Sequence, residues 1–174
     1  MQSRIPNDFF QNNDALFVAE NLIGKTLVRK FEDGQIFSSK IVETEAYFGI
    51  DDLACHASKG RTPRTEIMFQ NGGKIYVYLI YGMYWMLNFV TGKENHPQAV
   101  LIRGVENCIG PGRLGKLLKL DKSFYGENLN TSERLWVEDS TIDGEIITTP
   151  RIGVDYAGEM WKNKPWRFVL EKNQ

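Results

Sequence analysis

Apolar and aromatic residues fill almost the whole stretch KIYVYLIYGMYWMLN, residues 74–88, between the polar Lys74 and Asn88. Two runs of β-branched and aromatic residues flank Gly82 and Met83, which predicts a hairpin with a two-residue type II′ turn. This geometry places Tyr81, Met83 and Tyr84 at or beside an exposed tip. A large apolar side chain at a tip needs a partner, such as the base step that minor-groove proteins part with a wedge. Aromatic packing on a half-buried sheet is the simpler explanation of this stretch alone.

Patterns along the rest of the chain predict a mixed α/β (α+β) fold in a single domain, residues 1–174. Asn13 or Asp14 can cap a first helix, and Gly24 can end it. The expected helices span residues 14–23, 110–120 and 132–137, with another short helix opening at Thr62-Pro63 in a loop-rich region. The expected strands span residues 26–31, 36–47, 98–105, 148–154 and 165–171. Because hairpin signals such as Asp33-Gly34 outnumber crossovers, we expect mostly antiparallel pairing.

Composition and charge fit an ordinary globular protein. Hydrophobic residues make up 42% and charged residues 25% of the 174 residues, and no apolar run is long enough to predict a membrane span. The first residues lack the apolar core of a secretory signal, so we expect an intracellular protein rather than a secreted one. Two cysteines give no disulfide framework, so we expect Cys55 and Cys108 to be free thiols in a reducing compartment.

The net charge of −1 argues against general polyanion binding, but basic residues cluster locally. One cluster holds Lys59, Arg61, Arg64 and Lys74, and a second holds Arg113, Lys116, Lys119 and Lys122. A basic surface within a neutral protein and a solvated face of mixed charge both explain this distribution.

Candidate chemistry appears in the strand-like IVETEAY, residues 41–47. A period of two places Glu43, Glu45 and Tyr47 on one face of this strand. Paired carboxylates can carry out acid/base work on a glycosidic bond, although surface acids on a solvent-facing strand give the same pattern. His56 follows as one of only two histidines, and an isolated histidine is commonly structural.

Metal and cofactor sites are not predicted. Cys55, His56, His96 and Cys108 lack the spacing of zinc ligands. The glycine-rich stretches at Gly72-Gly73 and in GPGRLG lack the Lys-Ser/Thr ending of a phosphate-binding loop. We therefore expect neither a metal nor a cofactor.

Several motifs in order resemble the alkyladenine (3-methyladenine) DNA glycosylase family. They are VETEAYFGIDDLACH, GRTPRTEIMF, KIYVYLIYGMYWMLN, VLIRGVE, GPGRLGKLL, KSF, RIGVDYAGE and KPWRF. The resemblance covers nearly the whole chain and is weakest at residues 128–149. It implies a curved sheet with flanking helices and a protruding hairpin, related to the C-terminal domain of formyltransferases.

The resemblance also implies an activity and partners. A monofunctional base-excision glycosylase flips an alkylated or deaminated purine, such as 3-methyladenine or hypoxanthine, out of double-stranded DNA. It then hydrolyses the N-glycosidic bond with an activated water and leaves an abasic site. We expect a monomer that works on DNA inside the cell, without a membrane partner.

Site residues follow from matching positions in that family. Glu45 is expected to be the general base, and Arg103 to lie near the water and the target phosphate. Tyr47, His56 and Tyr78 are expected to enclose the flipped base, while Asn88 screens against normal guanine. Tyr81 is expected to fill the gap in the duplex, with Met83 beside it. On charge alone, the phosphate contacts are predicted to come from Lys59, Arg61, Arg64 and Arg113.

Elementary chemistry supports these assignments. Electron-rich aromatic faces attract a cationic alkylated purine, by about 0.5–2 kcal/mol per good contact. Neutral lesions need a proton on the leaving base, for which Glu43 is the nearest candidate by strand period. No lysine matches a catalytic amine, so we expect no lyase step. Two alternatives stay open: a binding module for distorted nucleic acid, and a carbohydrate hydrolase using Glu43 and Glu45.

Overall fold

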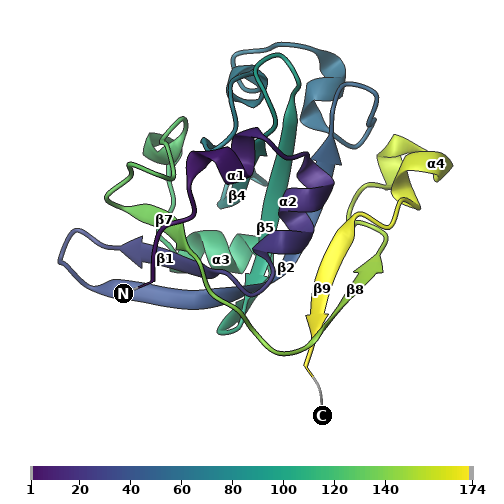
Figure 1. Ribbon diagram of the computed structural model, residues 1–174. Helices are drawn as coiled ribbons and strands as arrows, with labels where there is room; N and C mark the ends of the chain where they lie inside the picture. Colours follow the sequence, from purple (N-terminus) through teal and green to yellow (C-terminus); the bar gives the residue numbers. More distant parts are fainter. Residues whose placement is uncertain (1, 173–174) are drawn as a thin grey trace.

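The computed structural model describes residues 2–172, in which nine strands form one sheet (Figure 1). Every strand pairing is antiparallel, and the main path runs β3-β4-β5-β2-β1-β7. The strands are β1 (Thr26–Lys30), β2 (Ile36–Phe48), β3 (Ile75–Ile80), β4 (Tyr84–Thr91), β5 (Gln98–Val105), β6 (Cys108–Ile109), β7 (Leu135–Glu138), β8 (Glu145–Thr149) and β9 (Arg167–Glu171). The predicted mixed α/β fold on a mostly antiparallel sheet is confirmed.

Strand β2 is the centre of this sheet. Its first half pairs with β1, and its second half lies between β5 and β9, which both pair with residues 43–45. The register against β5 shifts on either side of Glu43, which marks a bulge. Residues 41–46 are therefore buried, and the two acids of the strand are core residues rather than surface acids.

Side chains alternate between two environments along β3, β4 and β5, as the pleat of a strand requires. One face carries Ile75, Val77, Leu87, Phe89, Val100 and Ile102, which belong to the main hydrophobic core. This core also includes buried residues of α1 (Asn7–Gln11), α2 (Ala15–Leu22) and α3 (Pro111–Leu117). The other face carries Tyr76, Tyr78, Asn88, Leu101 and Arg103, and it holds the candidate site.

The helices are short and begin where capping rules predict. Asp14 accepts a hydrogen bond from the Phe17 amide at 2.8 Å, which caps α2, and Pro111 starts α3. In Figure 1, α2 crosses β2 and β5, while the β8–β9 hairpin and α4 (Glu159–Lys162) flank it on one side. The longest helix within residues 2–172 has eight residues, so none there can cross a membrane.

Three predicted elements are wrong. Residues 132–137 do not form a helix, because Leu135–Glu138 is β7 and pairs with β1. The strand expected at 148–154 ends at Thr149, and residues 150–154 form a loop. The turn at Thr62-Pro63 leads only into a 3₁₀ helix, η2 (Glu66–Phe69). The other 3₁₀ helices are η1 (His56–Lys59), η3 (Lys122–Phe124) and η4 (Asp155–Ala157).

The hairpin is present, but its turn differs from the prediction. The Met83 amide donates to the Ile80 carbonyl at 3.1 Å, so the central residues are Tyr81 and Gly82. Their φ values of 53° and 65° are both left-handed, the pattern of a type I′ turn rather than type II′. An aromatic residue rarely adopts this φ, so the tip holds a strained tyrosine.

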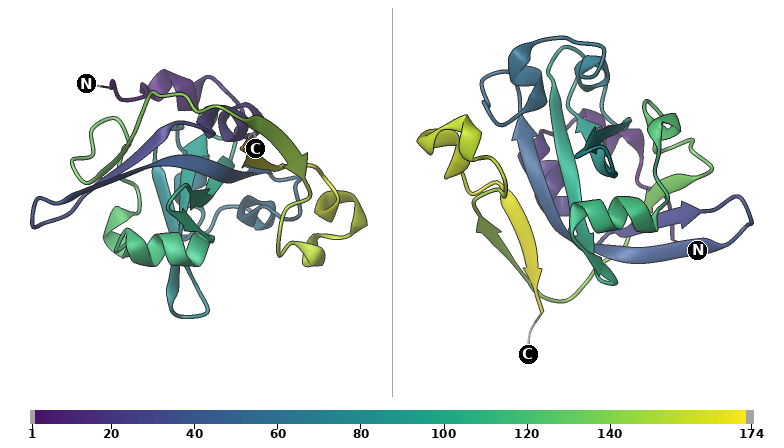
Figure 2. Two further views of the ribbon diagram at one scale, coloured as in Figure 1. Left: turned by 90° about the horizontal axis from the view of Figure 1, so that it is seen from below. Right: turned by 180° about the vertical axis from the view of Figure 1, so that it is seen from behind.

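The hairpin projects from the sheet beside α3 and away from α1 and α2 (Figure 2). Helix α3 supports its base at close range. A Cβ on Gly115 would lie 1.9 Å from the Trp85 carbonyl oxygen, so only glycine allows this approach. The tip is thus carried on a firmly packed stem.

Candidate active site

A cavity of about 680 Å³ opens on the Tyr76 and Tyr78 face of the sheet. Its lining comes from the strands β2 to β5, from residues 53–68 around η1 and η2, from Pro111 at the start of α3, and from residues 152–156, which lead into η4. Its volume lies in the range of sites that hold small organic molecules or single bases. The lining includes Tyr47, His56, Arg64, Tyr76, Tyr78, Tyr81, Asn88, Arg103, Ile152 and Tyr156.

An aromatic cluster forms one wall of the cavity. The His56 and Tyr78 rings lie edge to face with their centroids 4.6 Å apart, and Tyr76 lies 5.4 Å from Tyr78. The Tyr76 hydroxyl and His56 Nδ1 share a hydrogen bond of 2.8 Å. Sequence reasoning named His56 and Tyr78 but missed Tyr76, which fixes the imidazole ring.

Burial keeps this cluster uncharged. It lowers the pKa of His56 to about 4, with a further contribution from the nearby Arg64 guanidinium. Burial also raises the pKa of Tyr76 to about 12 and raises that of Tyr78. At neutral pH the cavity therefore presents a neutral imidazole and neutral phenols.

Glu45 has no exposed surface and lies directly behind the cavity wall. Its Oε2 accepts a hydrogen bond from the Tyr47 hydroxyl at 2.6 Å, and its Oε1 accepts from the Ile152 amide at 2.8 Å. Both donors belong to residues that line the cavity. Burial raises the pKa of Glu45, while the Arg103 charge and these hydrogen bonds oppose that shift.

Arg103 connects the two acids of β2. Its Nη1 lies 3.5 Å from Glu45 Oε1, and its Nε donates to Glu43 Oε1 at 3.0 Å. Arg167 from β9 donates to the same Glu43 oxygen at 2.8 Å. Two guanidinium groups thus engage Glu43, which gives it the surroundings of an acceptor rather than of a proton donor. Sequence reasoning missed Arg167, because it lies 124 positions from Glu43 and no pattern near it predicts that β9 pairs with β2.

A second ion pair lies behind the same wall. Arg151 and Asp52 have fully buried side chains, with Nη1–Oδ2 at 2.6 Å and Nη2–Oδ1 at 2.9 Å. The Arg151 guanidinium lies 4.9 Å from the Tyr47 ring centroid. Sequence reasoning missed this pair, since the two residues lie 99 positions apart and each occupies a loop.

The hairpin tip stands at the mouth of the cavity. Tyr81 lines the cavity yet is 84% exposed, and Met83 is 52% exposed. Asn88, by contrast, is buried and lines the interior, where its Nδ2 donates to the Tyr76 carbonyl at 3.2 Å. The structure therefore gathers every predicted pocket residue at one cavity. Of the two predicted wedge residues, Tyr81 lines the edge of this cavity, whereas Met83 is exposed in the same turn and does not line it.

The predicted phosphate contacts differ in their present partners. Arg61 donates to Glu66 Oε1 at 2.9 Å and also to Asn95, so its guanidinium is engaged. Arg64 lines the cavity with its guanidinium 4.9 Å from the Tyr78 ring centroid. Arg113 and Lys59 are exposed.

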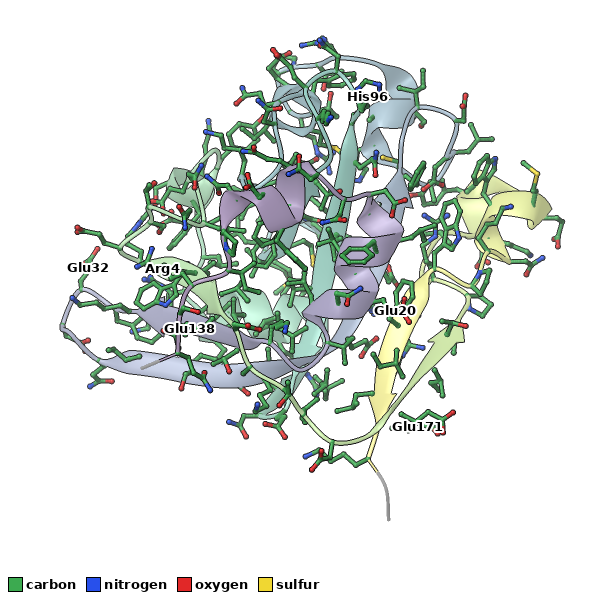
Figure 3. All side chains as sticks on the ribbon, in the orientation of Figure 1. Arg4, Glu20, Glu32, His96, Glu138 and Glu171 are labelled. Carbon is green, nitrogen blue, oxygen red and sulfur yellow. The ribbon has the colours of Figure 1, made fainter. Side chains whose placement is uncertain are left out.

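The residues that could suggest a metal site lie apart. Cys55 is buried and Cys108 is half-buried, both as free thiols, while His96 is exposed in the loop between β4 and β5 (Figure 3). Within residues 2–172, no three His, Cys, Asp or Glu side chains converge as metal ligands would.

Comparisons with known proteins identify the family of this chain. The model of the family described as methylpurine-DNA glycosylase (MPG) matches residues 8–109 and 106–174. A relative from Methanocella arvoryzae, named "Putative 3-methyladenine DNA glycosylase", is 44% identical over 97% of this chain and 92% of its own length. Relatives of the same name from Desulfitobacterium hafniense and Legionella pneumophila are 42% and 44% identical, covering 95% and 98% of this chain. These alignments span 94% and 96% of the two relatives.

Proposed function

The chain belongs to the methylpurine-DNA glycosylase family, and on this premise we propose that it releases damaged purines from duplex DNA by hydrolysing their N-glycosidic bonds. The observation that carries the proposal is the buried carboxylate of Glu45 behind an aromatic cavity, with an exposed apolar hairpin tip at its mouth. A hydrolase for a free small molecule would not need that tip. A module that only binds DNA would not need the buried carboxylate.

The first step is extrusion of the damaged nucleotide. The anomeric carbon is inaccessible inside the base stack, so the nucleotide must rotate out of the duplex. Tyr81 fills the gap that it leaves, and Met83 packs against the neighbouring pair. The stacking side chain recovers about 1–3 kcal/mol of the free energy lost by unstacking the base.

The cavity then holds the flipped base. Tyr47 and His56 stack on its two faces, and Tyr78 closes a third side. Because the pKa of His56 is about 4, the imidazole is neutral and does not repel a cationic methylated purine. The Arg64 guanidinium lies 4.9 Å from the Tyr78 ring centroid, at the border of this base site.

Glu45 acts as the general base. It accepts a proton from a water molecule whose oxygen attacks the anomeric carbon, and the electrons of the broken N-glycosidic bond leave with the purine. Arg103 Nη1, 3.5 Å from Glu45 Oε1, favours the ionised carboxylate. The developing oxocarbenium charge is stabilised by the same carboxylate. No amine attacks the sugar, so the enzyme is monofunctional and leaves an intact abasic strand.

The substrate range follows from the leaving group. Methylated purines such as 3-methyladenine are cationic and leave without further protonation. Deaminated purines such as hypoxanthine are neutral and react more slowly, since Glu43 is engaged by Arg103 and Arg167. Asn88 lies inside the cavity, where it screens against the exocyclic amino group of normal guanine.

The remaining proposals concern the protein as a whole. It acts as a single domain and a monomer on DNA inside the cell. Arg64, Arg113 and Lys59 contact phosphates, and Arg61 joins them only by leaving Glu66. Such contacts set the affinity and its dependence on salt rather than the sequence preference.

The deciding experiment measures base release from defined lesions. Duplex oligonucleotides that carry 3-methyladenine, 7-methylguanine, hypoxanthine or ethenoadenine are incubated with the protein. The proposal predicts free purine and an uncleaved strand that breaks only on later alkaline treatment. Binding without release would identify a recognition module, direct strand cleavage would indicate a lyase, and activity on simple glycosides alone would indicate a carbohydrate hydrolase.

A further inference from the structure

Resting on the proposed function, we propose that Arg151 and Asp52 are positioning residues that hold the Ile152 amide against the Glu45 carboxylate. The pair contacts neither the cavity nor the substrate, because both side chains are fully buried. It acts through the residue that follows Arg151 in the chain.

The Arg151 guanidinium ties together four parts of the chain. Nη1 donates to Asp52 Oδ2 and to the Ala46 carbonyl at 3.0 Å, next to Glu45 on β2. Nη2 donates to Asp52 Oδ1 and to the Trp161 carbonyl at 3.2 Å on α4. This fork geometry is specific to arginine, since an ammonium group cannot reproduce its parallel N–H bonds.

Little else fixes the position of Ile152. In the described residues, no backbone–backbone hydrogen bond involves residues 150–153, which lie between the end of β8 and η4. The Ile152 side chain is 50% exposed, so its own packing restrains it weakly. The buried guanidinium one residue earlier is therefore the main anchor of this amide.

The anchored amide has a defined task. It donates to Glu45 Oε1 while Tyr47 donates to Oε2, so the two hydrogen bonds set the rotation of the carboxylate about its last bond. Displacing such a group by about 1 Å lowers a reaction rate about 100-fold. If the Ile152 amide no longer donates to Oε1, the carboxylate stays buried but its orientation is no longer fixed.

Asp52 also fixes the loop that precedes His56. Its Oδ2 accepts from the Phe48 amide at 3.0 Å, and its Oδ1 accepts from the Ala54 amide at 3.1 Å. The carboxylate therefore orders the turn after β2 while it pairs with Arg151. Arg151 also lies 4.9 Å from the Tyr47 ring centroid, behind one of the proposed base-stacking residues.

The test is single-turnover base release by Arg151→Lys, which preserves the charge and removes the fork. We expect the rate at saturating enzyme to fall about 10–100-fold, while affinity for a duplex with an abasic-site analogue stays within about threefold. Arg29→Lys is the matched control, because Arg29 is also buried but bonds to the Leu118 carbonyl away from the cavity. Rates are divided by the fraction of molecules that bind the analogue.

A pH profile separates positioning from general loss of structure. Losing the amide donor raises the pKa of Glu45, so the acidic limb of the rate should move to higher pH in Arg151→Lys and not in Arg29→Lys. The other titratable or charged groups around Glu45 are unchanged in both variants. They are Tyr47 on β2, Tyr78 on β3, Arg103 on β5, Arg167 on β9 and Tyr156 on η4.

The outcomes distinguish this inference from the proposed function. Wild-type protein without base release would overturn the proposed function. An active wild type with equal rates and pH profiles in both lysine variants would overturn only the positioning role. If Arg151→Lys does not fold, Asp52→Asn replaces it, since it breaks one side of the ion pair and keeps the shape. An Asp52→Asn variant with the wild-type rate would likewise overturn the role.

Discussion

The buried carboxylate behind the cavity wall and the tip of the hairpin are built on opposite principles. Glu45 has no exposed surface, and each of its carboxylate oxygens already has a hydrogen-bond donor. Tyr81 at the tip is 84% exposed and strained at a φ of 53°. The proposed mechanism uses this difference: the carboxylate is oriented before DNA binds, whereas Tyr81 is to obtain its contacts from the duplex.

The largest expected effect on base release comes from replacing the buried carboxylate of Glu45. Glu45→Gln keeps the size of the side chain but removes the proton acceptor, so base release should fall about 10²–10⁴-fold. Single-turnover release from a lesion duplex gives this value. Affinity for an abasic-site analogue should change little, and an unchanged rate would remove Glu45 from the mechanism.

The next effect comes from the tip. Tyr81→Ala removes the stacking ring, which should weaken binding of a lesion duplex by about 1–3 kcal/mol, or about 5–150-fold. Fluorescence anisotropy measures this affinity. Phe17→Ala provides the control, because Phe17 is also an exposed aromatic residue but lies on α2. Equal affinities of wild type and Tyr81→Ala would exclude insertion of the ring.

A smaller effect is expected from removing one hydrogen bond to the Glu45 carboxylate. Tyr47→Phe keeps the ring but removes the donor to Glu45 Oε2, and this donor lowers the pKa of the carboxyl. Its loss therefore raises the Glu45 pKa, so the acidic limb of the rate should move to higher pH. Near neutral pH we expect a loss of only about tenfold or less, since the burial that dominates this pKa remains. An unmoved limb would show that this hydrogen bond does not tune Glu45.

The smallest effect concerns the surface around both regions. Arg113→Ala should reduce the slope of log affinity against log salt by about 0.9, the value for one phosphate contact. Titrations at several salt concentrations measure this slope. Arg61→Ala should change it less, because Arg61 is engaged by Glu66 and Asn95. A larger effect of Arg61 than of Arg113 would reverse our assignment of the binding surface.

The sequence predicted local structure well where neighbouring residues decide it. Strand period placed Glu43, Glu45 and Tyr47 on one face, and the cap at Asp14 marked the start of α2. Residues 132–137 were misjudged because their strand conformation depends on pairing with β1. The turn was misjudged because Tyr81 adopts a φ that its residue type disfavours.

The candidate site was predictable only in part, for a similar reason. The resemblance named His56 and Tyr78 as pocket residues, and the structure places both of them at one cavity. Of the two hydrogen-bond donors to Glu45, Tyr47 is a neighbour on the same strand, but the Ile152 amide comes from a segment 107 positions away. No sequence pattern indicates that Asp52 is buried and paired with Arg151, because both lie in loops whose docking depends on the whole fold.

A crystal structure of Glu45→Gln bound to a duplex with an alkylated purine tests the central claim most directly. The account predicts the damaged base between Tyr47 and His56, the Tyr81 ring in the gap of the duplex, and residue 45 in its present position. A damaged base still stacked in the duplex, with the cavity empty and Tyr81 in solvent, would contradict it.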